Sequence, residues 1–242
     1  MEKLVYLLWE RAQSDGDALR DWLLSECAPA LLAQGARGLA INVNDSQADV
    51  PAPLPTPEGE VPLGAQLSLW LDCHDRRGPF EELLRAHGDR VAGYLVTESL
   101  YTDYGENAHA GPRDWPDGAR SPGVLTVTLL EKPDHLDDWD WYAHWYGVQS
   151  PVSEAIQPRA RYVRNAVARR LDRDAPPYRG IVEEAWPSAE HVRDPMLFYC
   201  ADGDPERLRR HVEQMMASVN AFLELPRLRV VTMSEYLIKT VA

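Results

Sequence analysis

The segment DDWDWYAHWYG, residues 137–147, holds the densest group of side chains that could bind or transform a small molecule. It contains Trp139, Trp141, Tyr142, His144, Trp145 and Tyr146. An imidazole titrates near neutral pH, so His144 ranks first as a candidate general acid or base. A histidine among aromatic rings is also often a hydrogen-bonded structural group, and the rings could equally form core. We expect Tyr142, Trp145 and Tyr146 to contact a substrate.

Four polar residues interrupt the apolar faces of expected strands: Asn165, Glu184, Glu235 and Glu98. Side chains alternate between the two faces of a strand, which places each of them among apolar neighbours. A buried carboxylate must be ion-paired, solvated at a strand end, or functional. Glu184 is the second catalytic candidate, while Asn165, Glu235 and Trp186 are candidates for substrate binding. The Asn165 amide either orients a ligand or satisfies neighbouring backbone.

Motifs for metals, nucleotides and serine nucleophiles are absent from the sequence. There is no HxxxH, CxxC or GxSxG pattern, and the seven histidines are scattered. The glycine-containing stretch at 35–40 follows an expected helix, so it indicates a helix C-terminus and not a dinucleotide loop. We therefore expect no metal and no cofactor.

Charge and composition exclude several classes of partner. The chain has 242 residues, of which 45% are hydrophobic, with 25 Lys+Arg against 38 Asp+Glu and a net charge of −13. This negative field repels nucleic acids and anionic membranes, so neither is an expected partner. Three cysteines leave one thiol over in any disulfide pairing, and none has the close spacing of a zinc or redox motif. No apolar run approaches the roughly 20 residues of a membrane span, and no signal peptide is evident. The expected location is the cytoplasm.

The elements that must position these residues recur in two series. Periodicity and turn signals predict strand, helix, strand, strand, helix, strand at 4–10, 18–34, 37–44, 65–73, 79–88 and 90–101, and again at 123–131, 136–150, 161–169, 178–186, 205–223 and 227–238. Asn42 matches Asn165, and Trp70 matches Trp186. We therefore expect a degenerate repeat at 1–105, a linker at 106–122 and a second repeat at 123–242.

Two such βαββαβ units have a natural way to bury their apolar faces. Each would form a four-stranded antiparallel sheet with helices on one face, leaving the other face open. The predicted fold is thus α+β, with two tandem ferredoxin-like units closing an intramolecular α/β barrel. Its interior is the expected substrate site, beside His144, Tyr142, Asn165 and Glu184. Any homodimer should use outer surfaces. The long loops 45–62 and 102–122 are either lids or tolerated surface insertions.

The second half resembles the EthD domain family. The resemblance rests on HWYGVQSP (144–151), IQPRARYVRN (156–165), PPYRGIVEEAWPS (176–188) and RVVTMSEYL (229–237). Where such sequences commonly have a histidine before a proline, this chain has Ser150 before Pro151. The resemblance implies a dimeric α/β-barrel fold and a small hydrophobic substrate, aromatic or polycyclic. It implies either a cofactor-independent lyase, cyclase or oxygenase, or a non-catalytic binding or accessory protein of a metabolic pathway.

Overall fold

A single antiparallel β-barrel organises the chain. The computed structural model describes residues 1–9, 15–88 and 90–241. Its strands are β1 (Glu2–Trp9), β2 (Gly38–Val43), β3 (Leu63–Leu71), β4 (Arg90–Thr102), β5 (Val124–Glu131), β6 (Arg161–Arg170), β7 (Tyr178–Trp186) and β8 (Arg229–Lys239). They close in the order β1-β3-β2-β8-β5-β7-β6-β4. The predicted α+β class and closed barrel are therefore confirmed.

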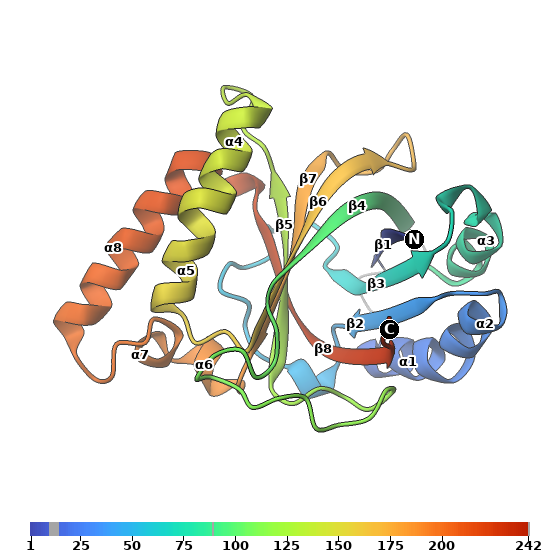
Figure 1. The fold of residues 1–242 in the computed structure, drawn as a ribbon, viewed down its shortest axis with the longest axis horizontal. Coiled ribbons are helices and arrows are strands. Elements are labelled where there is room, and N and C mark those ends of the chain that lie inside the picture. Colours follow the sequence, from blue (N-terminus) through green and yellow to red (C-terminus); the bar gives the residue numbers. More distant parts are fainter. Residues whose placement is uncertain (10–14, 89, 242) are drawn as a thin grey trace.

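Helices cover the outside of the barrel in two separate layers (Figure 1). The first layer consists of α1 (Gly16–Trp22), the π-helical η1 (Leu23–Cys27), α2 (Ala28–Ala33) and α3 (Gly78–His87). The second consists of α4 (Asp138–His144), the π-helical η4 (Trp145–Gln149), α5 (Ser150–Ile156), α6 (Glu190–Arg193), α7 (Pro195–Phe198) and α8 (Pro205–Phe222). The barrel separates the two layers, so each has its own packing against the outer faces of the strands.

Local capping explains where α8 begins and where α2 ends. The Asp204 side chain accepts hydrogen bonds from the backbone N–H groups of Glu206 and Arg207, and Pro205 occupies the first turn of α8. After α2, Gly35 adopts φ +100°, and the Ala36 N–H donates to the Leu31 carbonyl. Both boundaries match the sequence-based expectation, because capping depends on neighbouring residues only.

The strands at the two junctions between the halves pair in the same way. Asn42 of β2 lies opposite Glu235 of β8, and Asn165 of β6 lies opposite Glu98 of β4. Each half also supplies four adjacent strands in the same spatial order, fourth, first, third and second. A strand register that differed by one residue would put these polar side chains on the opposite face of the sheet.

The expected match between Trp70 and Trp186 is wrong by one residue. Asn42 lies opposite Gln66 of β3, and Asn165, its match in the second half, lies opposite Ile181 of β7. Four residues further along these two strands are Trp70 and Ala185, so Trp70 corresponds to Ala185. Because side chains alternate along a strand, the one-residue error placed two tryptophans on one face that in fact occupy opposite faces.

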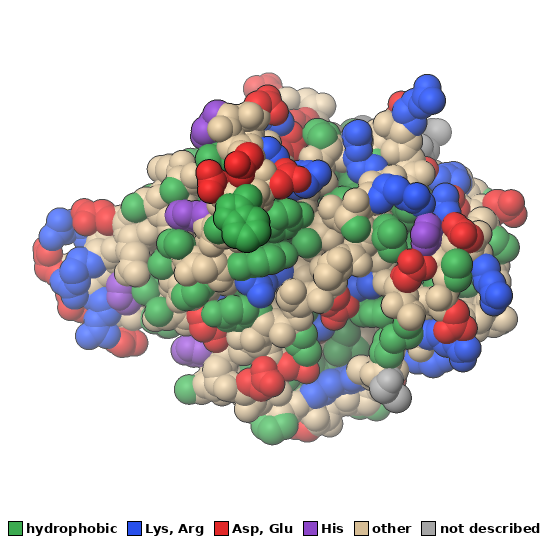
Figure 2. Space-filling view, turned by 45° about the horizontal axis from the view of Figure 1, so that its top comes forward, with side chains coloured by type: hydrophobic (Ala, Val, Ile, Leu, Met, Phe, Trp, Pro, Cys, Tyr) green, Lys and Arg blue, Asp and Glu red, His purple; other side chains and the backbone are tan. Residues whose placement is uncertain are grey.

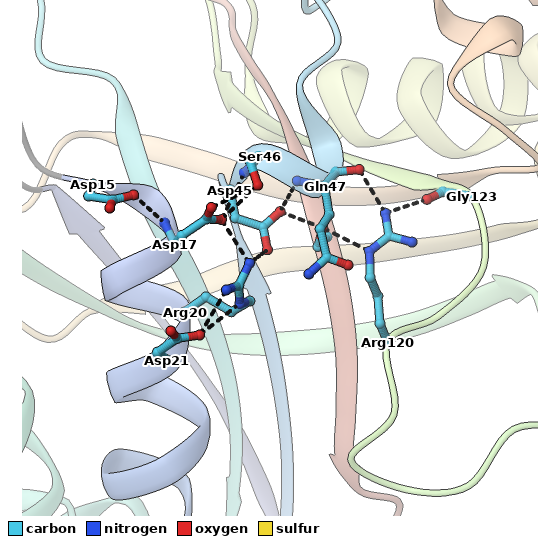
Figure 3. A network of polar contacts seen from close by, with 10 residues as sticks. Asp15, Asp17, Arg20, Asp21, Asp45, Ser46, Gln47, Arg120 and Gly123 are labelled. Carbon is cyan, nitrogen blue, oxygen red and sulfur yellow. Dashed lines mark hydrogen bonds and ion pairs between the residues drawn. The ribbon is translucent and has the colours of Figure 1, made fainter.

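The loop after β2 and the 102–122 segment make hydrogen bonds at one end of the barrel. After β2, the fully buried carboxylate of Asp45 accepts hydrogen bonds from Ser234 and Arg20 at 2.7 and 3.3 Å (Figure 3). In the 102–122 segment, Arg120 donates to the carbonyls of Gln47 and Gly123 at 3.1 and 2.8 Å. The contacts of Arg120 join the linker to the loop after β2. The charged side chains of Asp45, Arg20 and Arg120 all have hydrogen-bond partners within the protein.

Candidate functional site

Side chains of the described residues point into the barrel interior, which is the substrate site expected from the sequence. The apolar ones include Val5, Leu7, Val127, Ile181 and Met233, all fully buried. Beside them a polar network joins strands of both halves. A mostly apolar space open to a ligand was expected here, but the inward residues of β3 and β7 include Gln66, Ser68 and Glu183, which bind one another across the barrel.

Glu183 is the centre of that network. Its Oε1 accepts hydrogen bonds from Asn165 at 2.9 Å and Gln66 at 3.2 Å, and lies 3.4 Å from Lys3 Nζ. Burial alone would raise the pKa of Glu183, but the charges of Lys3 and Arg161 and these hydrogen bonds outweigh it and hold the pKa below its ordinary value. The carboxylate is therefore ionised inside the barrel and ties the two halves together.

The two interior residues predicted to bind substrate belong to this structural network. Asn165 is fully buried and also donates to the Ile181 carbonyl at 3.1 Å. Glu235 accepts hydrogen bonds from Arg161 at 3.1 Å and from the Tyr104 hydroxyl at 2.8 Å. Burial and the Glu235 charge raise the pKa of Tyr104, so its hydroxyl stays protonated and can donate. Tyr104 comes from the 102–122 segment, where its ring packs edge-on against Trp115.

A cavity of about 280 Å³ lies outside the barrel, within the second helix layer. Its floor is the outer face of β5, β6, β7 and β8, and its walls come from η4, α5, α7 and α8. Its lining residues are Thr126, Thr128, Leu130, Trp145, Gln149, Ser153, Gln157, Tyr162, Val182, Glu184, Trp186, Phe198, Tyr199, Met215, Met216, Val219, Phe222, Leu223, Leu225, Leu228 and Val230, with Pro53 and Leu54 from the 45–62 loop. This loop therefore contributes to a cavity wall.

One end of the cavity is polar, and Glu184 defines it. Its Oε1 accepts a hydrogen bond from Arg159 at 3.1 Å, and its Oε2 lies 3.4 Å from the Thr126 hydroxyl. Thr126 in turn accepts from the Trp186 indole N–H at 3.0 Å. The Glu184 side chain is 18% exposed, so a molecule in the cavity can reach the carboxylate.

Arg159 lies behind Glu184 and is fully buried. Its second terminal nitrogen donates to Glu154 at 3.0 Å, and the guanidinium stacks over the Tyr162 ring at 3.8 Å from the ring centroid. The Tyr162 hydroxyl accepts from the Trp145 indole at 3.3 Å. Buried charges are tolerated when they are paired and hydrogen-bonded, and here one guanidinium is shared by two carboxylates.

Trp145, Trp186 and Glu184 are thus predicted site residues that meet at one cavity, but His144 does not join them. The His144 Nε2 contacts the Ser218 carbonyl at 2.9 Å, and its ring stacks on Phe222 at 5.2 Å between centroids. The expectation that His144 and Glu184 meet inside the barrel is wrong on both counts. Consecutive helical residues point about 100° apart, so Trp145 can face the cavity while His144 faces α8.

Tyr142 and Tyr146 also lie away from the cavity lining. Both are half-buried and pack against the cluster that contains Trp141 and Trp145. Arg164 of β6 stacks over Tyr146 at 4.2 Å from the ring centroid. Trp139 is 82% exposed on the same helix. Figure 2 shows hydrophobic side chains gathered beside acidic ones on this face. The aromatic density of 137–147 is therefore divided between surface, core and cavity.

Sequence reasoning missed several residues of this site, chiefly Thr126, Gln149 and Met215 in the cavity lining and Arg159 behind Glu184. Alternation did place Glu184 and Trp186 on one face. Alternation did not show that this face is the outer one, because both faces of the strand carry a mixture of polar and apolar residues.

The fold, an antiparallel barrel closed by the strands of one chain with helices outside, is similar to the folds of several solved structures. An anthrone oxidase-like protein has a TM-score of 0.55 and 11% identity over 100% of this chain and 94% of that one. A "putative monooxygenase" from Lactobacillus acidophilus has a TM-score of 0.50 and 10% identity over 98% and 96%. A chlorite dismutase mutant from Candidatus Nitrospira defluvii has a TM-score of 0.49 and 8% identity over 98% and 92%.

No family model and no curated protein matches the sequence. Within the described ranges, no helix is long and apolar enough to cross a membrane, and no three His, Cys, Asp or Glu side chains are grouped to hold a metal ion.

Proposed function

We propose that the chain binds a small, mostly apolar molecule in the cavity of the second helix layer. The observation that carries this proposal is a space of about 280 Å³ lined mainly by apolar side chains, with one reachable carboxylate at its end. Such concave, largely apolar spaces with a few placed polar groups are typical small-molecule sites. Small-molecule sites commonly enclose about 300–1,000 Å³, so this cavity is at the small end and suits a molecule of one to three fused rings.

An aromatic or polycyclic ligand fits this lining best. Trp145, Trp186 and Phe198 supply ring faces, while Met215 and Met216 can adapt to an irregular shape. The resemblance of residues 144–237 to EthD domains supports the same ligand class. So does the shared fold with an anthrone oxidase-like protein and a monooxygenase-like protein, although a shared fold alone does not assign chemistry.

Binding without catalysis is the version that the side chains favour. Among the described lining residues there is no histidine or cysteine, and the single carboxylate is already paired with Arg159. A cofactor-independent lyase, cyclase or oxygenase is the second candidate. It is favoured by Glu184, which reaches the cavity and could accept a proton from a bound substrate. His144 would take no part in it.

We also infer that the fold arose from two tandem ferredoxin-like units. The matching order and registers of the strands support this inference. So do the π-helical segments η1 and η4, which occupy the same place in each half and are each followed by a proline, Pro29 and Pro151. The boundaries at 105 and 123, the cytoplasmic location and dimerisation through outer surfaces stay predictions.

Cavity blocking tests the binding proposal. Val219→Trp would place a large ring in the cavity from α8, whereas Ala217→Trp adds the same ring at an exposed position of the same helix. We expect naphthalene, titrated by calorimetry, to bind the unmodified protein and Ala217→Trp, and to bind Val219→Trp at least about 10-fold more weakly. No binding to the unmodified protein, or equal binding to all three proteins, would overturn the proposal.

A further inference from the structure

A helix layer can pack on this barrel without polar residues at the position of Thr126 and Glu184, as the first layer shows. Between β1 and β3, Leu4 lies opposite Leu69, and both are buried under the first helix layer. Between β5 and β7, the pair in the corresponding register is Thr126 opposite Glu184. The same cross-strand position is therefore a leucine pair in the apolar core of the first layer and a hydroxyl and carboxylate pair at the cavity of the second.

The carboxylate of Glu184 is the charged group that faces the cavity. Among the described residues its ion-pair partner is Arg159, which is shared with Glu154. The other guanidinium nearby, Arg164, binds Ser150 and stacks over Tyr146, and it does not line the cavity. Arg159 and Glu154 do not line the cavity, so a bound molecule meets the oxygens of Glu184 and not the guanidinium. A ligand carboxylate placed there would face like charge with little water to screen it.

Two further polar side chains line the cavity, and neither offers an open acceptor. Gln149 on η4 has a buried Oε1 with almost no accessible surface, and its Nε2 contacts the weakly accepting sulfur of Met215 at 3.3 Å. The Tyr162 hydroxyl already contacts Trp145 and Ser150. Glu184 therefore carries the recognition of the ligand's polar end.

We infer that the cavity selects neutral apolar ligands whose polar end donates a hydrogen bond, such as phenols and enols, and rejects carboxylates of the same shape. The inference rests on the proposed function and names the ligand class of that site. Glu184 acts as the selecting residue by accepting the ligand's O–H. Arg159 is a positioning residue that holds the carboxylate at the cavity end.

Three ligands that share one ring system distinguish binding in the cavity from selection of its polar end. They are naphthalene, 2-naphthol and 2-naphthoate, each titrated into the full chain at neutral pH. We expect naphthol to bind at least about 10-fold more tightly than naphthoate, and also more tightly than naphthalene. Binding of none of the three would reject the proposed function itself. Binding of naphthalene together with equal or tighter binding of naphthoate would reject only the selectivity inferred here.

Glu184→Gln and Glu154→Gln form the matched pair of variants. Each removes one carboxylate charge from Arg159, but only residue 184 lines the cavity. We expect Glu184→Gln to reduce the preference for naphthol over naphthoate by about 10-fold, and Glu154→Gln to change it by no more than about twofold. Thermal melting of both variants shows that they are folded. An unchanged preference in folded Glu184→Gln, or equal changes in both, would overturn the assignment.

Discussion

The two helix layers lie on the same barrel, but apolar side chains fill the centre of the first, which we call solid, whereas the second contains a mainly apolar cavity and is hollow. The pockets beside the first layer are lined largely by polar residues, such as Asp15 and Asp45 or Arg37 and Asp72. Under α1, α2 and α3, the outward residues of β1, β2 and β3 include Leu4, Leu8, Ile41 and Leu69, which form one core with the helices. Under α5 and α8, the corresponding layer contains the cavity. The strand registers are alike in both, but α7 and part of the 45–62 loop also border the cavity, so it results from side-chain choice together with these segments.

The π-helical segments show the same contrast. In η1, Leu23 and Cys27 are fully buried and fill the first layer. In η4, Trp145 and Gln149 occupy the matching positions and face the cavity. A π-bulge widens a helix locally and is often found at functional sites, yet here only one of two matching bulges borders an open space. The local backbone distortion alone is therefore not a sufficient sign of a site.

Truncation of a side chain should affect the two layers very differently. Leu23→Ala removes a fully buried side chain from the solid layer, and we expect the free energy of unfolding to fall by about 2–5 kcal/mol. Val219→Ala removes two methyl groups that already border an empty space, so a loss of about 1 kcal/mol or less is expected. Urea denaturation measures both. Similar losses at the two positions would contradict the contrast between a solid and a hollow layer.

The barrel interior should support both layers without taking part in ligand binding. Asn165→Leu removes the hydrogen bonds to Glu183 and Ile181, and we expect a stability loss of roughly 1–3 kcal/mol. The dissociation constant for 2-naphthol should stay within about twofold, because Asn165 faces the inside and the cavity lies outside. Denaturation and calorimetry on one preparation test this. A large loss of affinity with intact stability would move the site into the barrel.

Acid should weaken the barrel through Glu183. The pKa of this carboxyl is lowered from its ordinary 4.5, so its stabilising effect is present above about pH 4.5 and is lost as the pH falls from there through the lower folded-state value. Each tenfold difference in proton affinity between the folded and unfolded chains corresponds to about 1.4 kcal/mol. The free energy of unfolding of Glu183→Gln, measured from neutral to acidic pH, should decline less steeply than that of the unmodified protein.

Filling the hollow layer should cost little stability. Thr128 lines the cavity, makes no side-chain hydrogen bond among the described residues, and corresponds in register to Tyr6 of the solid layer. We expect Thr128→Leu to change the free energy of unfolding by about 1 kcal/mol or less, while naphthalene affinity falls at least about 10-fold. Calorimetry and denaturation measure the two effects. Unchanged affinity would indicate that the ligand lies elsewhere.

Local signals in the sequence predicted most of the fold. The strand expected at 178–186 is β7 residue for residue, and the helix expected at 205–223 is α8 extended by one residue. Alternation, capping and turn residues are properties of neighbouring positions, which explains this accuracy. The short α6 and α7 were missed, because four-residue helices have no measurable periodicity.

The site was predicted only in part, because it depends on which face of each strand is turned inward. Glu183 and Glu184 are adjacent and chemically identical, yet one lies in the barrel and the other at the cavity. Alternation separates them but does not say which is inside. The partners that decide the matter, Lys3 and Arg159, lie 180 and 25 residues away along the chain. Only the assembled barrel reveals them.

Closure of the barrel within one chain has a consequence for how the protein can vary. In a barrel assembled from two identical chains, every substitution appears twice and alters both helix layers at once. Here residues 4 and 126, or 69 and 184, are encoded separately, although they occupy matching places. One layer can therefore keep its leucines and supply stability, while the other accumulates polar and cavity-forming residues that a doubled substitution would make too destabilising.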